Sequence, residues 1–324
     1  MMINTVTGQI NTDSLGKTLM HEHLAIGFSG WLLDPASKAD RREELAICVD
    51  RLQELKAAGY SSLLDPCPND VGRDVDLMGE AAARAGFNIV CATGFYNEHL
   101  GGNAYWVVKS QFDPDFVDRL ADIMIAEITE GVAGTKVKAG VIKLATSAAP
   151  ITDYERKVFA AGAKASLATG APITTHTDAV WGDVQLRLLT SLGVPAHKII
   201  IGHSCGSQDH AYHMGLVDGG AYVGFDRFGI ESICSDDDRI EALLKLVRAG
   251  KSRQLVVSHD SVWCLRGALL PPPRMEEMKL GLGPLRFERV IRPKLMAAGV
   301  SEGEIDTMLV DNPRRYFAGV AHSH

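Results

Sequence analysis

The chain has 324 residues, of which 46% are hydrophobic and 23% are charged, and its formal net charge is −7. This composition is typical of a globular protein, and the acidic balance argues against a nucleic-acid partner or an anionic membrane surface. No apolar stretch approaches the roughly 20 residues that a membrane helix needs. We therefore expect a small-molecule partner.

Six cysteines are spread along the chain without a CxxC pair, which indicates reduced thiols. The N-terminal stretch "MMINTVTGQINTDSLG" has neither the basic nor the apolar region of a secretory signal. Both features predict a cytoplasmic protein.

Short β-rich segments recur along the chain, and they are near-continuous apolar runs, as strands buried on both faces are. The predicted strands span 17–24, 60–67, 88–96, 140–146, 172–177, 198–204, 221–227 and 253–260.

Amphipathic segments separate these strands. In the segment 39–59, leucine and valine recur at helical spacing, and Gly59 offers a C-terminal cap. Thr152 and Glu155 form a capping-box pattern at the start of another helix. Further helices are expected over 118–131 and 236–250.

Eight strand–helix alternations predict a (β/α)₈ TIM barrel over about residues 16–318, within a single domain of residues 1–324. A doubly wound sheet is the alternative, but no GxGxxG motif follows the first strand.

The predicted strands end in polar or ionisable residues, and in a barrel these ends carry the catalytic groups. In chain order the residues are His21 and His23, Asp65, Tyr96, Lys143, His176, His203, Arg227 and Asp260. Four histidines, a lysine and an aspartate meeting at one barrel mouth indicate a functional site.

The first strand contains "TLMHEHLAIG", in which His21 and His23 flank a glutamate. Residues two apart on a strand share a face, so the imidazoles should lie together while Glu22 points away. Two neutral histidines on a buried face favour a metal ion, although a hydrogen-bonded core pair would explain HxH equally well.

The nitrogen and oxygen donors suit zinc or a similar first-row ion. Four histidines exceed what one catalytic zinc takes while leaving a position for water. Two ions would use all four histidines, and a bridging anion would then offset their repulsion. Asp260 can serve one ion, whereas a bare ammonium at Lys143 can serve neither.

The strand-end motifs resemble those of the phosphotriesterase family of the amidohydrolase superfamily, which includes the phosphotriesterase-like lactonases. The similarity runs from about Gly16 to Phe317. It rests on "GKTLMHEHL", "ATGFY", "VIKLAT", "THTDA", "IGHS", "GFDRFG", "VVSHD" and "SEGEIDTMLVDNPRRYF".

The resemblance implies a binuclear metal centre. His21, His23 and Asp260 would bind the first ion, and His176 and His203 the second. Lys143, carboxylated on its amine (N6-carboxylysine), would bridge the two ions together with a hydroxide. Zinc is the expected metal, with cobalt, manganese or iron as alternatives.

The implied activity is a metal-dependent hydrolase that uses the bridging hydroxide as nucleophile, with Asp260 as ligand and general base. Tyr96 and Arg227 occupy positions similar to the substrate-side tyrosine and arginine of the lactonases. The expected enzyme is thus a lactonase for acyl-homoserine or related lactones, with weaker phosphotriesterase and arylesterase activity. A primary phosphotriesterase is the alternative, and Arg227 could instead pair with Asp226 or Asp209.

Two features bear on the pocket and on proton relay. The segment 261–284 after the last strand is long and apolar, and with 228–238 it should shape the leaving-group pocket. The family often carries an aspartate three residues after the sixth-strand histidine, where this chain has Gly206, which leaves Asp209 or His259 as relay candidates. The expected pocket residues are Trp263, Cys264, Leu265 and Met275.

Other functions remain open at this point. Lys143 could form a Schiff base, as in aldolase barrels, or the barrel could bind metal without catalysis. The family often dimerises, so a homodimer is expected, with apolar residues near Trp31 and Tyr105 as an interface unless they cover the barrel instead.

Overall fold

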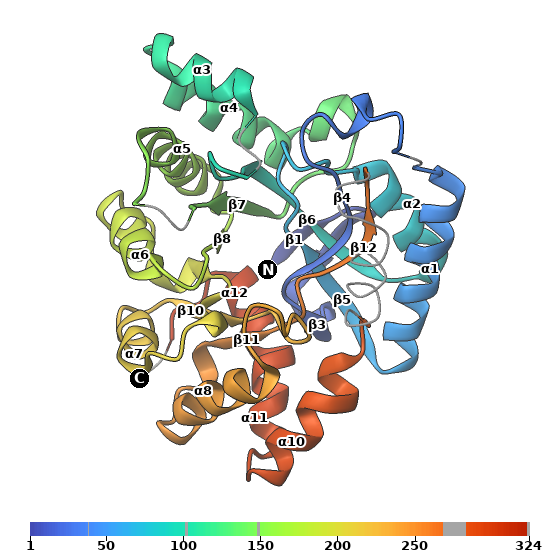
Figure 1. Ribbon diagram of the computed structural model, residues 1–324, viewed down its shortest axis with the longest axis vertical. Helices are drawn as coiled ribbons and strands as arrows, with labels where there is room; N and C mark the ends of the chain where they lie inside the picture. Colours follow the sequence, from blue (N-terminus) through green and yellow to red (C-terminus); the bar gives the residue numbers. More distant parts are fainter. Residues whose placement is uncertain (38, 101–102, 148–149, 268–282, 323–324) are drawn as a thin grey trace.

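The computed structural model describes residues 1–324 except 38, 101–102, 148–149, 268–282 and 323–324. Its centre is an eight-stranded parallel sheet in the order β11-β10-β9-β8-β7-β6-β5-β3 (Figure 1). The main-chain N–H of Met20 donates to the carbonyl of Val257 at 3.4 Å, so the two edges of the sheet meet and nearly close a barrel. The predicted (β/α)₈ architecture is confirmed. The barrel strands are β3 (Lys17–Leu19), β5 (Tyr60–Asp65), β6 (Asn88–Phe95), β7 (Val141–Ala145), β8 (Ile173–His176), β9 (Ile199–Ile201), β10 (Tyr222–Phe225) and β11 (Leu255–Val257).

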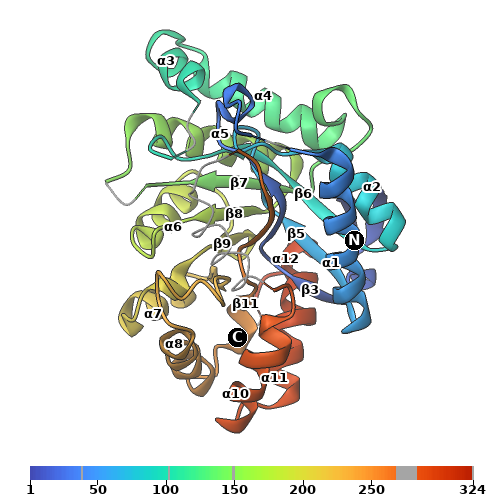
Figure 2. The same ribbon diagram turned by 45° about the vertical axis from the view of Figure 1, so that its right-hand side comes forward.

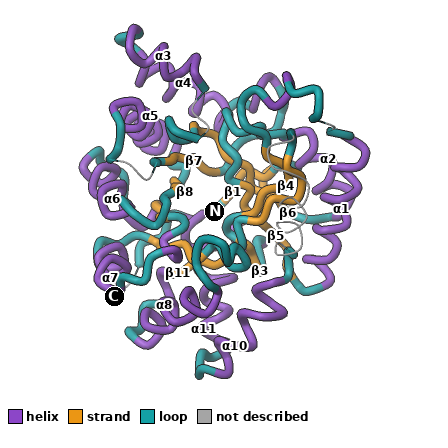
Figure 3. The backbone as a smooth tube through the Cα atoms, viewed as in Figure 1, coloured by secondary structure: helices purple, strands orange, loops and turns teal. Residues whose placement is uncertain are grey.

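Helices surround the barrel, and α3 projects from it in both ribbon views (Figures 1 and 2). The tube drawing shows the strands gathered inside this layer (Figure 3). The helices are α1 (Arg41–Ala57), α2 (Val75–Ala85), α3 (Ala104–Phe112), α4 (Phe116–Thr129), α5 (Asp153–Thr169), α6 (Gly182–Ser191), α7 (His210–Asp218), α8 (Asp236–Arg248), α10 (Arg292–Ala297), α11 (Glu302–Asp306) and α12 (Asn312–Ala318). Within the described part of the chain, none of them has the length and apolar character to cross a bilayer.

Helix ends follow the local sequence. Helix α5 begins with the expected capping box, in which the Thr152 hydroxyl accepts from the Glu155 N–H and the Glu155 carboxylate accepts from the Thr152 N–H. Helix α1 ends one residue earlier than expected, with Ala58 as its cap, and Gly59 follows in the left-handed conformation at φ 88°.

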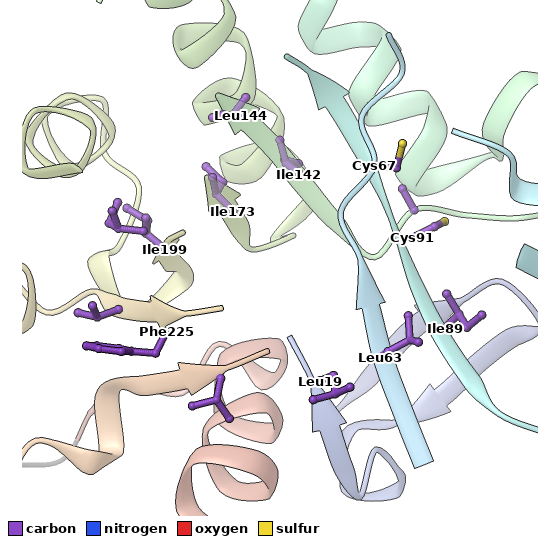
Figure 4. Packing of buried hydrophobic residues seen from close by; sticks show 14 of the residues in the cluster. Leu19, Leu63, Cys67, Ile89, Cys91, Ile142, Leu144, Ile173, Ile199 and Phe225 are labelled. Carbon is purple, nitrogen blue, oxygen red and sulfur yellow. The ribbon is translucent and has the colours of Figure 1, made fainter. Parts of the chain in front are cut away.

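The barrel strands read as continuous apolar runs because both of their faces are buried. Along β5 to β11, one face packs beneath the helices and the other fills the barrel, where Val90 and Val141 meet Tyr316 of α12. Lys143 lies two residues beyond Val141 on β7, so it belongs to the interior face. Figure 4 shows ten labelled side chains of the outer cluster: Leu19, Leu63, Cys67, Ile89, Cys91, Ile142, Leu144, Ile173, Ile199 and Phe225.

Two expectations about strands and loops were wrong in detail, and one hairpin was not predicted. The segment 17–24 is two strands, β3 and β4 (Glu22–Ile26), because after Leu19 the chain leaves the barrel sheet and pairs with β12 (Ser261–Leu265). The expected long loop over 261–284 therefore begins with a strand, β12, which pairs in parallel with β4. A short N-terminal hairpin, β1 (Met2–Thr5) with β2 (Gly8–Asn11), was not anticipated because it lacks an apolar run.

Candidate metal centre

Three buried histidines converge on the carboxylate of Asp260, and Lys143 contacts one of them. Nε2 of His21 and Nε2 of His23 lie 3.4 and 3.3 Å from its Oδ1, and Nε2 of His203 lies 3.7 Å from its Oδ2. The Lys143 ammonium lies 3.2 Å from Nε2 of His21. Residues separated by up to 239 positions in the sequence thus share one cluster.

Carboxylates face the other imidazole nitrogens. Asp226 lies 3.0 Å from Nδ1 of His203 and 3.3 Å from Nδ1 of His21, and Asp65 lies 3.4 Å from Nδ1 of His23. The two longer contacts lack hydrogen-bond geometry. Metal-binding histidines usually present the outer nitrogen to a carboxylate or carbonyl, which turns the inner nitrogen toward the ion.

The donor set fits divalent cations. His21, His23 and Asp260 form one group whose ligand atoms lie within 4.8 Å of one another, and His21, His203 and Asp226 form a second such group. All are nitrogen or carboxylate oxygen donors, as zinc and similar ions require. These buried clusters are consistent with a binuclear metal site.

His176, at the end of β8, joins the cluster through His203, with ring centroids 4.6 Å apart. The hydroxyl of Tyr96 lies 3.2 Å from its Nδ1, and Asp178 lies 3.3 Å from its Nε2. The main-chain N–H of Tyr96 donates to the Asp70 carboxylate at 2.9 Å, and this hydrogen bond holds the first residue after β6.

Arg227 is nearly buried and points into the same cluster. Its Nε donates to Oδ2 of Asp260 at 2.9 Å, and its ion-pair partner is neither Asp226 nor Asp209. Asp209 instead caps α7 by accepting the N–H groups of Ala211 and Tyr212.

Burial sets the protonation of the cluster. It lowers the pKa of Lys143 to about 8 and the pKa of His176 to about 4, and it holds the pKa of His203 well below its usual value. Burial alone would raise the pKa of Asp260, but interactions with the surrounding histidines and with Arg227 hold it well below its usual value. His23 differs, because Asp260 and other hydrogen-bond partners outweigh burial and raise its pKa. Metal binding would displace that proton.

Two cluster residues have strained backbones. His203 and Asp260 adopt the left-handed conformation at φ 59° and 54°, each just after a barrel strand. This conformation costs a non-glycine residue roughly 1–2 kcal/mol, and such strain concentrates at functional sites. The bend turns both side chains into the barrel mouth.

Three of the four expected pocket residues lie on β12. Trp263 and Leu265 are half-buried on β12, whereas Cys264 lies in the hydrophobic core with its Sγ toward the carbonyl of Glu44 on α1. Met275 lies outside the described residues.

Glu22 and His259 lie behind the cluster. The Glu22 carboxylate accepts from the Ser258 hydroxyl at 2.7 Å and from Nδ1 of His259 at 2.7 Å, as well as from Ser261. Nε2 of His259 accepts the main-chain N–H of Phe287 at 2.9 Å. Sequence reasoning did not identify Asp226 as a histidine partner, and its position in "GFDRFG" at a strand end was the available signal.

A parallel eight-stranded barrel with histidine and carboxylate clusters at the carboxyl ends of its strands defines the class of metal-dependent barrel hydrolases. The sequence matches the phosphotriesterase family over residues 1–317, and the chain belongs to this family. It is a phosphotriesterase-family hydrolase.

Similar proteins cover nearly the whole chain. The organophosphorus hydrolase from Deinococcus radiodurans superposes with a TM-score of 0.93 at 37% identity, covering 98% of this chain and 97% of that one. A mutant PTE-like lactonase from Deinococcus radiodurans gives a TM-score of 0.92 at 37% identity, covering 97% and 99%. The aryldialkylphosphatase of Saccharolobus solfataricus is 32% identical over 316 residues, covering 95% of this chain and 97% of that protein.

Proposed function

We propose that this protein is a two-metal lactonase with weaker phosphotriesterase and arylesterase activity. The observation that carries the proposal is the convergence of three imidazole Nε2 atoms on Asp260, with Lys143 beside Nε2 of His21 and Arg227 donating to the Asp260 carboxylate.

In this proposal two divalent ions, most simply zinc, occupy the cluster. His21, His23 and Asp260 hold the first ion. His176 and His203 would hold the second, and carboxylated Lys143 would be an anionic ligand for both. The bound ions supply Lewis acidity and lower the pKa of water so that hydroxide is available near neutral pH.

The Lys143 amine is suited to carboxylation because it is buried and its pKa is lowered to about 8, so more of it is neutral than in an exposed lysine. The neutral amine adds to carbon dioxide, a nitrogen–carbon bond forms, and one proton is released. A positive charge beside His21 is thereby replaced by an anionic carbamate.

The chain's own residues would then position and protonate the substrate. Asp260 is an anion at neutral pH and can accept a proton from the attacking water. The guanidinium of Arg227 and the hydroxyl of Tyr96 are donors for the ring oxygen of a lactone and for the carboxylate that forms on opening. Half-buried Trp263 and Leu265 supply an apolar wall, to which Cys264 does not contribute because it faces α1.

The choice of lactone over phosphotriester rests on the Arg227–Tyr96 pair of donors, and the similarity to a PTE-like lactonase supports it. A primary phosphotriesterase is the second candidate, since this chain is also similar over nearly its whole length to an organophosphorus hydrolase and to an aryldialkylphosphatase.

The test combines metal analysis, intact-mass measurement and a paired assay. We expect two metal equivalents, a labile mass increment of one carbon dioxide, and a higher kcat/KM for acyl-homoserine lactones or δ-lactones than for paraoxon-like triesters. A preference for triesters by orders of magnitude would establish the second candidate. Borohydride trapping of substrate on Lys143, without bound metal, would instead indicate Schiff-base chemistry.

The proposal extends to a cytoplasmic homodimer. All six cysteines are free thiols. Apolar side chains stand exposed on α3 at Tyr105 and Phe112, and at Leu33 in the short helix Trp31–Leu33, whereas Trp106 packs on Phe95 and covers the barrel. Light scattering should show a dimer that Phe112→Glu dissociates and that Ile233→Glu, at an exposed apolar residue outside α3, leaves intact.

A further inference from the structure

Asp226 faces the outer nitrogens of two cluster histidines at once. Its Oδ1 accepts the main-chain N–H of His203 at 2.9 Å and lies 3.0 Å from Nδ1 of the same residue. Its Oδ2 lies 3.3 Å from Nδ1 of His21. All three side chains are about 1% exposed, so water does not replace these contacts.

The barrel interior leaves room for this carboxylate. A Cβ atom on Gly224 would clash with Oδ2 of Asp226 and would lie 3.0 Å from Cα of Gly202. Gly224 lies on β10 two residues before Asp226, and Gly202 follows the neighbouring strand β9, directly before His203. Any side chain at residue 224 would therefore push the carboxylate away from its present place.

We propose that Asp226 is a positioning residue that couples the two metal sites. The inference rests on the proposed function, in which His21 and His203 bind different ions. One rigid carboxylate faces Nδ1 of both imidazoles, as a hydrogen-bond partner of His203 and in contact with His21, so both Nε2 atoms are turned toward the metal sites. Because the two oxygens cannot move independently, a displacement at one imidazole is transmitted to the other.

Asp65 provides a matched comparison. It is also buried and also accepts main-chain N–H groups, from Leu24 and Cys67, but among the cluster histidines it contacts His23 alone. Loss of the Asp65 carboxylate should weaken binding of the ion held by His23 and leave binding of the second ion unchanged.

The experiment titrates the metal-stripped full chain with Co²⁺ in bicarbonate buffer against a chromophoric chelator, together with the cobalt absorption spectrum. Wild-type protein should bind two ions. Asp226→Ser should raise both dissociation constants by about 10- to 100-fold, the usual effect of losing such a partner. Asp65→Ser should raise only one of them. Gly224→Ala keeps the charge but displaces the carboxylate, so it should also weaken both, and it replaces Asp226→Ser if that variant does not fold.

The outcomes separate the two ideas. If wild-type protein binds two ions but Asp226→Ser and Gly224→Ala each weaken only one site, the coupling is wrong and the proposed function stands. If wild-type protein binds fewer than two ions, the proposed function fails, and the coupling fails with it.

Discussion

Nε of Arg227 donates a hydrogen bond to Oδ2 of Asp260 at 2.9 Å, and the two side chains are 11% and 14% exposed. The guanidinium that we propose as a substrate contact thus lies against the carboxylate that we propose as a metal ligand. Arg227 has two roles to separate, namely orientation of Asp260 and contact with the substrate.

Arg227→Ala should lower kcat/KM for lactones roughly 10- to 100-fold, because a hydrogen bond to a charged group contributes about 1.5–3 kcal/mol. The loss for a phosphotriester should be smaller, since no carboxylate forms on its hydrolysis. Steady-state kinetics on both substrates, with metal content measured in parallel, provide the check. Equal losses for the two substrates would mean that Arg227 acts only through Asp260.

Lys143→Ala should lose bound metal and activity together, because the bridging anion is removed while two cations still repel each other. Short carboxylic acids should restore part of the activity by supplying the missing carboxylate. Metal analysis with and without added acetate or propionate measures both effects. Lys164→Ala, at an exposed lysine paired with Asp118, is the control; full activity in Lys143→Ala would contradict the bridge.

His259→Leu should lower the free energy of unfolding by about 2–4 kcal/mol. The substitution leaves the N–H of Phe287 without its acceptor. It also removes one of the two donors that His259 offers to the buried Glu22 carboxylate, namely Nδ1, while the main-chain N–H remains. Each buried polar group that loses its partner costs about 1–3 kcal/mol. His213→Leu, at an equally buried histidine with one hydrogen bond, should cost less in the same urea titration.

Asp70→Asn should stabilise the protein at pH 8 and have little effect near pH 4. Burial raises the pKa of Asp70 to about 7 from 3.8, so between these values the folded protein holds a proton that the unfolded chain releases. The free energy of unfolding therefore falls as pH rises through this window, and the asparagine variant avoids that loss. Its gain over wild type at pH 8 should exceed about 1 kcal/mol.

Urea titrations of both proteins from pH 4 to pH 8 test this pH dependence. The exposed Asp76→Asn serves as the control. A difference between Asp70→Asn and wild type that does not change with pH would contradict the assignment.

Local sequence patterns were enough to predict the barrel and the residues at its mouth. The patterns used were local ones: strand and helix periodicity, the Thr152–Glu155 cap and the polar strand ends. Each pattern predicts the structure of the residues that carry it. In parallel strands the carboxyl ends share one edge, so residues at those ends had to meet.

Only the tertiary structure decided which groups touch. The pairing of β4 with β12, the two histidines that face Asp226, and the partner of Arg227 all depend on register and twist between strands distant in the sequence. The left-handed bends at His203 and Asp260 are uncommon for any non-glycine residue, although histidine and aspartate adopt them more often than most, and no local pattern indicated them. Contacts between residues far apart in the chain are set by packing of the whole barrel, which local propensity does not encode.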